Sequence, residues 1–509
     1  MSVLALSARA HAQDESDAVG FGDSETKSDA AGFGEAESDE AGWGGEDEGE
    51  GEGNDDAAGF ADAPEVAPVD ETPSPFSLTG FARSQWGLWL ERLEDNPFAK
   101  GRQNLDLQLR FSTEHWRVVA SAHGEYDLAY RVDRDDYDAA TLDAYEHLID
   151  IRETYVSGTL EPLEFTFGRL VMPWGQGDVV SILDVAAPRD FREPGLSDLE
   201  DLRLPVLATR FGFFFGYHRI ETVIIHEAFF GYRPAPLGEF SPVRSLIADE
   251  TGLDPAALAE LSDVRFRDRG GGLRFEKQQY ALTWSYKGPE FDASIYAASI
   301  VDQFGIFAGI EPDLSLTPIP PELDVVLEHP RYYLFGYAGA APFGDWLVKW
   351  EFSVVPRRQY NLQPPRGRAF EFLIEPERFT EKGTFAGAML GITYSGLPKT
   401  VLFFEGAQNT PLDATGDLLF GSNAPTFAVR SMHLLLDEDL RADLAFYGMG
   451  YALEYGFLAR AELTYRLTDA FKWSVGAITY HPGDELGLLS GLGMHDRVFS
   501  TLRWDFQVF

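Results

Sequence analysis

The sequence predicts an all-β protein, a transmembrane antiparallel up-and-down β-barrel of the kind found in bacterial outer membranes. First, the chain from Phe76 to Phe509 divides into about 18 amphipathic segments of about ten residues each. Second, the gaps between these segments alternate between short and long, as do the periplasmic turns and outer loops of such barrels. Third, no apolar run is as long as a membrane-spanning helix, so strands would have to cross the membrane.

Apolar and polar side chains alternate within each segment, which places them on opposite faces of a strand. In 105–111, Leu and Phe alternate with Asp, Gln and Arg. In 346–354, Trp346, Val348 and Trp350 alternate with Leu, Lys and Glu. Large aromatic side chains stand on the apolar face, often near the ends of segments. This distribution favours a lipid-facing wall with aromatic girdles.

The positions of the segments give the expected strands. An even number of strands places both termini on the periplasmic side. About 18 strands fit best, and 16 is the alternative count. The gap at 454–456 is the one exception to the alternation, because it is short where a long gap is expected. We expect strands to begin near Ser77, Gln103, Trp116, Ile149, Leu163, Val206, Ile220, Gly272, Phe291, Arg331, Asp345, Thr384, Thr400, Thr426, Leu440, Phe457, Ala470 and Arg497.

Two segments depart from this simple pattern. Within the long gap 232–270, residues 241–262 read as helical rather than extended, because Asp254-Pro255 can begin a helix and an Ala-rich run follows. A short helix here would be either a lid or plug or an inert surface cap. At the other end, Phe509 is a terminal aromatic, but the apolar row that includes Leu502 and Trp504 is shifted from it by one residue. A shift of one residue reverses the faces of a strand, so we expect Phe509 at the strand end rather than in the lipid-facing row.

Composition excludes several other classes of protein. The chain has no cysteine, which excludes disulfides and thiolate metal sites and fits an exported barrel. Its formal net charge of −42 argues against a nucleic-acid partner. No zinc-type His spacing, Gly-x-Ser-x-Gly elbow or phosphate-binding loop is present, so we expect no enzyme activity, no cofactor and no metal. The alternating Ser121, His123, Glu125 and Asp127 are what a hydrated barrel lumen requires.

The first twelve residues, 1–12, resemble the end of a secretory signal peptide. Ala10-His11-Ala12 fits a signal-peptidase site. The apolar stretch before it is short and a basic region is missing, so we expect a truncated signal peptide. A merely Ala-rich start without a targeting role is the alternative.

Residues 13–75 form an acidic tail and a Pro-rich linker before the barrel, residues 76–509. Within 13–72 there are 21 Asp and Glu residues and one basic residue, Lys27, so this part carries a charge of 1 − 21 = −20. Rich in Gly, Ala and Ser, it cannot bury a core and is expected to be disordered. It is either a docking segment for a partner or only a solvated leader. In the docking interpretation the contacts come from its spaced aromatic residues, Phe21, Phe33, Trp43 and Phe60.

One long gap, residues 172–205, differs from a generic acidic loop because it mixes Arg and Asp or Glu with backbone-restricting Pro and Gly. Long loops of a barrel can fold back into the lumen and narrow it, and charged groups in such a constriction select solutes by charge and size. Alternatively these groups pair with each other and with the wall and only hold the loop; the two interpretations are compatible. The expected pore-lining residues of this loop and the adjoining strands are Arg169, Trp174, Asp178, Asp184, Arg189, Asp190, Arg192, Glu193, Arg203 and Arg210.

This loop also carries a resemblance to a known family. Gly168-Arg169, the Trp-Gly-x-Gly-Asp of 174–178, the Asp-Val-x-x-Pro-Arg-Asp of 184–190 and the Arg-x-Pro-Val of 203–206 resemble uncharacterised proteobacterial outer-membrane porin-like proteins, the DUF1302-like family. The acidic, Gly- and aromatic-containing leader of that family resembles residues 13–62. The number of strands more distantly resembles that of alginate-export barrels. The resemblance implies transport, often beside inner-membrane exporters of the resistance–nodulation–division type that handle hydrophobic or amphiphilic cargo.

Together these observations predict an outer-membrane channel that passes or exports a solute through a pore constricted by the 172–205 loop. Its partners would be outer-membrane lipid, the transported solute and a periplasmic component of an inner-membrane exporter. Alternatives are a passive general porin and a barrel that anchors periplasmic machinery through its acidic tail. A soluble β protein is the remaining alternative.

Overall fold

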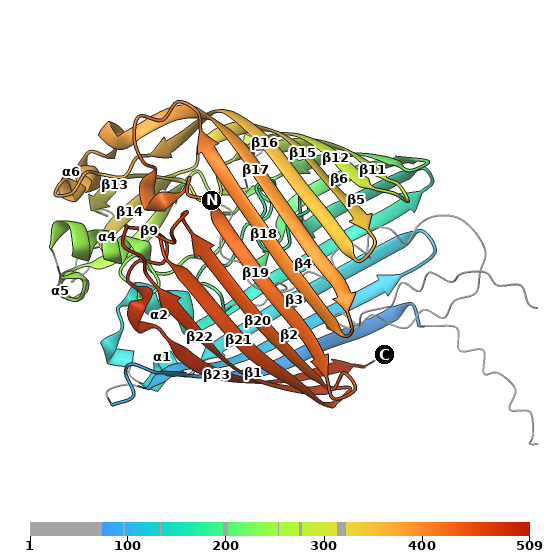
Figure 1. Cartoon of the computed structure of the whole chain (residues 1–509), viewed down its shortest axis with the longest axis horizontal. Coiled ribbons are helices and arrows are strands. Elements are labelled where there is room, and N and C mark those ends of the chain that lie inside the picture. The colour runs from blue at the N-terminus through green and yellow to red at the C-terminus, as the bar shows by residue number, and fades with distance from the viewer. Residues whose placement is uncertain are drawn as a thin grey trace, which may run out of the picture.

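Eighteen strands form one closed antiparallel barrel in the computed structural model, which describes residues 74–94, 97–132, 134–196, 202–252, 254–273, 277–312 and 322–508 (Figure 1). Each strand pairs with its neighbours in chain order, and β1 closes the ring against β23. The predicted fold class and the preferred strand count are therefore confirmed. The barrel strands are β1 (Phe76–Trp89), β2 (Phe98–Ser112), β3 (Trp116–Asp127), β4 (His147–Leu160), β5 (Leu163–Leu170), β6 (Val206–Phe215), β7 (His218–Ile225), β11 (Gln279–Lys287), β12 (Asp292–Val301), β15 (Arg331–Phe343), β16 (Trp346–Asn361), β17 (Thr380–Leu397), β18 (Thr400–Pro411), β19 (Thr426–Leu435), β20 (Leu440–Met449), β21 (Phe457–Thr468), β22 (Phe471–His481) and β23 (Arg497–Gln507).

The two ends of the barrel differ as the gap pattern predicts. One end carries short turns such as 161–162 and 469–470, and the other carries the long loops. The exceptional gap, at 450–456 between β20 and β21, lies at the long-loop end and is simply a short member of that set. Both ends of the barrel chain, Phe76 and Gln507, lie at the short-turn end, because the number of strands is even.

One expected strand start was wrong. Gly272 does not begin a wall strand; β11 begins at Gln279. Instead, Gly272–Leu273 is a two-residue strand, β10, that pairs with β8 (Glu227–Ala228) outside the wall. The physical reason is the backbone of Gly270 and Gly272, whose φ angles of +97° and +91° break an extended run.

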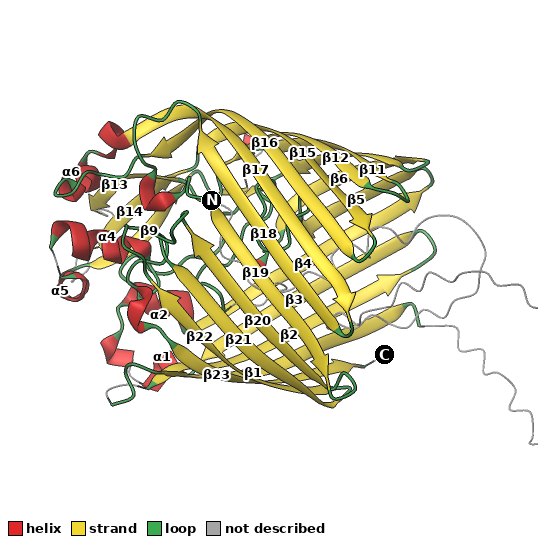
Figure 2. Cartoon of the chain, in the orientation of Figure 1, coloured by secondary structure: helices red, strands yellow, loops and turns green. Residues whose placement is uncertain are grey.

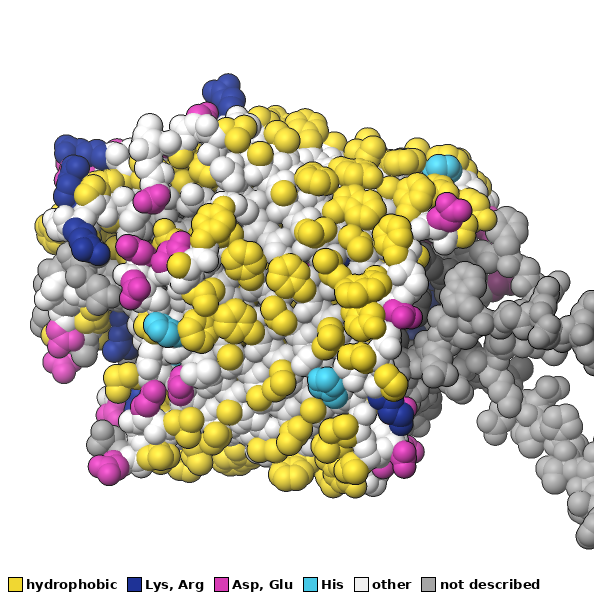
Figure 3. Space-filling view, in the orientation of Figure 1, with side chains coloured by type: hydrophobic (Ala, Val, Ile, Leu, Met, Phe, Trp, Pro, Cys, Tyr) yellow, Lys and Arg dark blue, Asp and Glu magenta, His cyan; other side chains and the backbone are white. Residues whose placement is uncertain are grey.

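The outer face of the wall is apolar and the inner face is polar. On β23, Leu502 and Trp504 are each 44% exposed, whereas Arg503 between them points inward and is bonded to Asp505. The apolar row predicted for the end of the chain is therefore the outward one; Phe509 itself lies outside the described residues. Hydrophobic side chains cover much of the wall in Figure 3. Such a band is the surface that a transmembrane barrel presents to lipid.

A cap of short elements covers the long-loop end (Figure 2). A second sheet pairs β13 antiparallel to β14, and β14 parallel to β9; the sequence pattern did not reveal these strands. The helical segment expected at 241–262 is confirmed as two helices, α4 and α5. Besides β8 and β10, the described elements outside the barrel are α1 (Ala129–Val132), α2 (Ala139–Tyr145), α4 (Pro242–Thr251), α5 (Pro255–Leu261), α6 (Ala369–Ile374), β9 (Asp263–Arg269), β13 (Ile306–Pro312), β14 (Glu322–Glu328), and the 3-10 turns η1 (Arg134–Asp136), η3 (Pro376–Phe379), η4 (Leu419–Gly421) and η5 (Leu492–Met494).

The apolar core has two parts. The larger part lies inside the barrel, where Leu183 and other side chains of the 172–205 loop meet inward-facing wall residues such as Ile300 and Leu458. The smaller part joins the cap elements through Ile247, Phe372 and their neighbours. Within the described ranges, none of the helices is long and apolar enough to cross a membrane.

Candidate functional site: a loop across the barrel lumen

The loop between β5 and β6, residues 171–205, is folded into the barrel, and we refer to it as the constriction loop. Its residues 171–196 and 202–205 are described, and most of them are buried. Trp174 packs against Tyr296 of the inner wall, with 5.9 Å between ring centroids. Burial of a loop this size requires partners for its backbone polar groups, and the wall supplies them.

Glu351 of β16 is the main partner on one side of the lumen. Its side chain is fully buried, and its carboxylate accepts hydrogen bonds from four loop amides at 2.5 to 3.2 Å. Gly175 allows this approach: its φ is +87°, and a Cβ there would overlap the carboxylate. The donors to Glu351 are the backbone N–H groups of Gln176, Gly177, Ile182 and Leu183 and the hydroxyl of Ser181.

Glu405 of β18 repeats this arrangement on a neighbouring part of the wall. Its carboxylate accepts the amide N–H of Asp178 at 2.7 Å, of Val179 at 2.7 Å and of Val180 at 2.8 Å. The side chain of Asp178 forms an ion pair with Lys349 of β16. Two buried carboxylates therefore hold the first half of the constriction loop by its backbone, since a carboxylate can accept several N–H groups at once.

Asp184 organises the middle of the loop. Its carboxylate accepts from Arg189 Nη2 at 2.7 Å and from Arg203 Nε at 2.9 Å, and its side chain is fully buried. Burial alone would raise the pKa of Asp184, but the guanidinium groups of Arg203 and Arg189 outweigh it and lower that pKa to about 2. Asp184, Arg189 and Arg203, which the sequence predicts to line the pore, therefore form ion pairs with one another within the loop.

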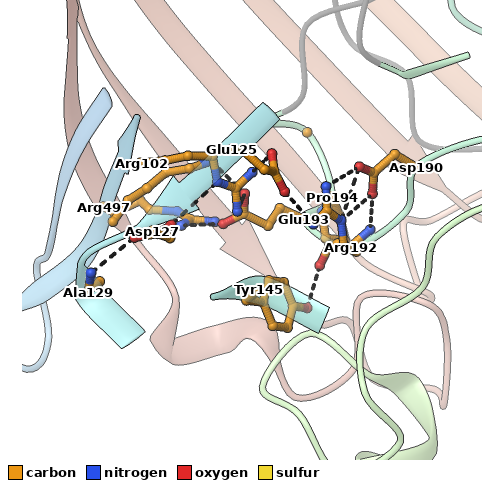
Figure 4. Close-up of polar contacts among 12 residues, drawn as sticks. Arg102, Glu125, Asp127, Ala129, Tyr145, Asp190, Arg192, Glu193, Pro194 and Arg497 are labelled. Carbon is orange, nitrogen blue, oxygen red and sulfur yellow. Dashed lines mark hydrogen bonds and ion pairs between the residues drawn. The ribbon is translucent and has the colours of Figure 1, made fainter. Parts of the chain in front are cut away.

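Arg192 connects the second half of the loop to the opposite wall (Figure 4). Its guanidinium donates to Asp190 at 2.6 Å and to Glu125 of β3 at 2.5 Å. Its carbonyl oxygen accepts the hydroxyl of Tyr145, from α2, at 2.8 Å. The ring of Tyr232 lies 5.3 Å from the guanidinium carbon. Arg192 thus has partners on the loop, the wall and the cap.

Glu193 meets three wall cations that converge on it. Its carboxylate lies 2.5 Å from Lys100 Nζ, 3.1 Å from Arg102 Nη2 and 3.5 Å from Arg497 Nη1. Figure 4 shows Arg102 and Arg497 pointing toward it from the wall. Burial would raise the pKa of Glu193, but Arg102, Lys100 and Arg497 hold it well below its usual range.

The remaining expected pore residues, Arg169 and Arg210, are wall residues and not part of these clusters. Arg169 is the second-last residue of β5 and has the same strand phase as Phe167, whose ring is on the outer face. The guanidinium of Arg169 donates to the Pro205 carbonyl at 3.1 Å and lies 3.7 Å from Glu227. The lumen position expected for Arg169 is therefore wrong, because strand phase turns it to the rim. Arg210, on β6, donates to Glu164 at 3.0 Å on the inner face.

Sequence reasoning missed Glu351 and Glu405. The one available signal is that each is acidic and stands at an inward position of its strand. Nothing in the strand sequence tells which loop amides it meets, because Glu351 and Gly177 are 174 residues apart. The expected docking residues Phe21, Phe33, Trp43 and Phe60 lie outside the described residues.

Above the constriction loop, at the long-loop end, lies a cavity of about 230 Å³, here called the outer cavity. Its lining is rich in Phe side chains, contributed by loops, the cap sheet, α6, η4 and β17. A smaller space of about 30 Å³ shares several of these residues and reaches Ile182, Asp184 and Arg189 of the constriction loop. The phenylalanines lining the outer cavity are Phe191, Phe230, Phe240, Phe266, Phe304, Phe307, Phe372, Phe385 and Phe420.

The described residues offer no group of three or more His, Cys, Asp or Glu side chains placed to hold a metal ion. What the arrangement provides is a physical barrier. A fixed segment crosses the lumen, with buried ion pairs on one side and carboxylate–amide contacts on the other.

Comparisons with solved structures give matches of low identity, and one of them, OpdK, is described as an outer membrane protein. OccAB3 of Acinetobacter baumannii is 10% identical, with 85% of this chain and 99% of that chain covered and a TM-score of 0.47. OccK11 (OpdR) of Pseudomonas aeruginosa is 8% identical, with 85% and 96% covered and a TM-score of 0.45. OpdK of Pseudomonas aeruginosa is 8% identical, with 85% and 99% covered and a TM-score of 0.43.

A comparison with curated proteins gave no match. The model of one protein family matches residues 97–482, which is more than half of the 509-residue chain and contains the constriction loop. That family is described as "Protein of unknown function (DUF1302)". The resemblance that the loop motifs suggest thus rests on most of the barrel, and the chain belongs to the DUF1302 family.

Proposed function

We propose that this protein is an outer-membrane channel whose lumen is narrowed by the constriction loop. The observation that carries the proposal is that the loop is attached to opposite sides of the ring. Glu193 binds to β2, whereas Glu351 belongs to β16, and eight strands separate β2 from β16 in either direction. A segment fixed at both sides of a lumen sets its free cross-section, which controls what passes.

The orientation follows from general barrel architecture. Short turns face the periplasm in outer-membrane barrels, and longer loops face outward. We therefore place Phe76 and Gln507 at the periplasmic end and the outer cavity at the cell surface. The apolar band on the wall supports insertion in lipid.

The outer cavity indicates the class of solute. Phe side chains line it together with Leu, Ile, Val and Pro side chains, and polar groups such as Asn361, Arg358 and Asp302 stand among them. Sites of this composition bind molecules with an apolar body and a few polar groups. We propose that the channel passes an amphiphilic solute through the outer cavity to the constriction loop.

Single-channel recording in planar bilayers tests the constriction. In the Glu351→Gln/Glu405→Gln double variant, each carboxylate becomes an amide that keeps one acceptor oxygen and turns N–H donors toward the loop amides. Buried N–H groups then lose their acceptors at about 1–3 kcal/mol each. The loop should leave the lumen part of the time, and the conductance should rise at least about two-fold with frequent fluctuations.

Glu221→Gln is the matched control, because it makes the same change on the inner wall, where Glu221 contacts Arg219 and Arg210. Its conductance should equal that of the unmodified protein. If the double variant conducts as the unmodified protein does, the loop does not set the constriction. If the unmodified protein conducts no ions at either positive or negative applied voltage, the proposed function is wrong.

A further inference from the structure

Three of the residues that line the outer cavity carry a buried polar atom with no hydrogen-bond partner among the described residues. These atoms are Nη2 of Arg233, Oγ of Ser241 and Oε1 of Gln303. Buried polar groups of folded proteins nearly always have a partner, and leaving one without costs stability. Three such groups around one cavity therefore indicate that a bound molecule completes their hydrogen bonds.

Ser241 is the clearest of the three. It is the N-cap residue of α4, a position where a serine hydroxyl usually accepts an N–H of the first helical turn. Its side chain makes no capping hydrogen bond, and the residue is only 2% exposed. The fold thus buries this hydroxyl beside the cavity without using it.

Asn361, another polar residue of the lining, shows the contrast. Its side-chain oxygen accepts the N–H of Phe307 at 2.8 Å, and its amide nitrogen donates to the Phe307 carbonyl at 3.2 Å and to the Thr380 hydroxyl at 3.0 Å. These contacts join the cap strand β13 to the ends of β16 and β17. Asn361 therefore has a structural role, which the three unpaired atoms lack.

The charged groups around the outer cavity already have partners of opposite sign. Arg358 donates from Nε and Nη2 to Asp302 at 2.9 and 2.7 Å, and Arg233 donates from Nη1 to Asp268 at 2.9 Å. A carboxylate that entered the cavity would lose its hydration and would meet these two carboxylates as well as the guanidinium groups. The lining leaves hydrogen bonds unmet rather than charge, which favours an uncharged ligand.

The unpaired atoms also define the polar group that fits. Nη2 of Arg233 can only donate a hydrogen bond, Oε1 of Gln303 can only accept one, and the Ser241 hydroxyl can do either. A hydroxyl group both donates and accepts, so it complements all three. An ether or an ester cannot donate, and an ammonium group cannot accept. The phenylalanines of the lining suit an apolar body attached to that hydroxyl.

We propose that the outer cavity binds an uncharged amphiphile through a hydroxyl group. The hydroxyl meets Arg233, Ser241 and Gln303, and the apolar body lies among the phenylalanines. This inference rests on the proposed function and deepens it, because it names the class of solute that the channel takes up. A long-chain alcohol is the simplest molecule of this class.

Photolabelling of the full chain in lipid nanodiscs tests the site without measuring conduction. Three probes, dodecanol, dodecanoate and dodecane, carry the same diazirine near the end of the chain and differ only in the head group. At about pH 9 the carboxyl group is ionised. Mass spectrometry gives the labelling of Phe304 and Phe307 in the cavity, which is divided by that of Leu502 and Trp504 on the lipid-facing wall to correct for partitioning into lipid. This ratio should be at least about five-fold higher for dodecanol than for either other probe.

Two substitutions on the protein remove the hydrogen bonds with little change of volume. In the Ser241→Ala/Gln303→Leu variant, the ratio for dodecanol should fall at least about five-fold, to that of dodecane. Ser422→Ala is the matched control. Ser422 also lines the cavity, but it is only half-buried and its hydroxyl is not among the unpaired buried atoms. Its substitution should leave the ratio unchanged.

Three results would overturn the inference. Equal ratios for dodecanol and dodecanoate would mean that the site accepts anions, and equal ratios for dodecanol and dodecane would mean that the polar atoms do not select. Labelling of the wall without labelling of the cavity would mean that water completes the hydrogen bonds. Conduction by the unmodified protein would leave the proposed function standing in each case. Hydroxyl-dependent labelling without conduction would keep the binding site and refute the channel.

Discussion

The constriction loop is held differently on its two sides. Toward β2, β3 and β23 it is held by charge pairs between side chains, in which Glu193 and Arg192 meet wall residues of opposite sign. Toward β16 and β18 it is held by Glu351 and Glu405, which accept backbone N–H groups. The first kind of attachment depends on which side chains the loop carries, and the second depends on the path of its backbone.

The two sides of the loop should therefore respond differently to mutation. Removing one member of a buried ion pair leaves its partners charged and uncompensated, which is strongly destabilising. Removing a carboxylate that accepts amides leaves neutral donors without acceptors. Three predictions test this distinction.

The largest effect is expected from Glu193→Gln. It leaves the buried Lys100, Arg102 and Arg497 without their shared carboxylate and should weaken loop docking by about 3–5 kcal/mol. Hydrogen exchange of the loop amides in the detergent-solubilised barrel measures this loss. The double variant Glu193→Gln/Lys100→Met should recover part of the protection, because it removes one uncompensated cation. Equal exchange of the loop amides in the single and double variants would show that the ion pairs of Glu193 do not hold this side of the loop.

A smaller effect is expected from acid. Because the pKa of Asp184 is lowered from 3.8 to about 2, its ion pairs add about 2 kcal/mol to loop stability at neutral pH. A lowered folded-state pKa means that this contribution is complete above the unfolded value and is lost as pH falls through about 2. The increase in loop-amide exchange that Asp184→Asn causes should therefore stay the same between about pH 8 and 5 and shrink only as pH falls toward 2. An effect of Asp184→Asn that already shrinks between pH 7 and 5 would contradict the assignment.

The smallest effect is expected from Arg210→Gln. Arg210 lies on the wall, and its ion pair with Glu164 is partly exposed to the lumen. Such pairs contribute about 0–1 kcal/mol. Exchange of the loop amides should not change, and the reversal potential in a salt gradient should move by a small amount toward cation selectivity. Loop exchange as large as that of Glu193→Gln would mean that the wall and the loop are coupled there.

Much of the barrel could be predicted from the sequence because its signals are local. Alternation of apolar and polar residues within about ten positions defines a wall strand, and expected starts such as Trp116, Leu163 and Val206 coincide with the observed ones. The strand start expected at Gly272 was wrong because the alternation of apolar and polar residues continues past a glycine-rich turn. The cap strands β13 and β14 were missed because strands that pair outside the wall leave no trace in the gap pattern.

By itself, then, the sequence predicted an up-and-down barrel, favoured 18 strands over 16 and singled out one unusual loop, since all three signals lie in neighbouring residues. It also determined which charges that loop carries, and Asp184, Arg189 and Arg203 pair within it. Only the tertiary structure decided that Arg169 turns to the rim and that Glu351 and Glu405 receive the loop backbone. The physical reason is that closing the ring brings together residues from distant strands, and the atoms that then meet depend on its three-dimensional geometry rather than on nearby sequence.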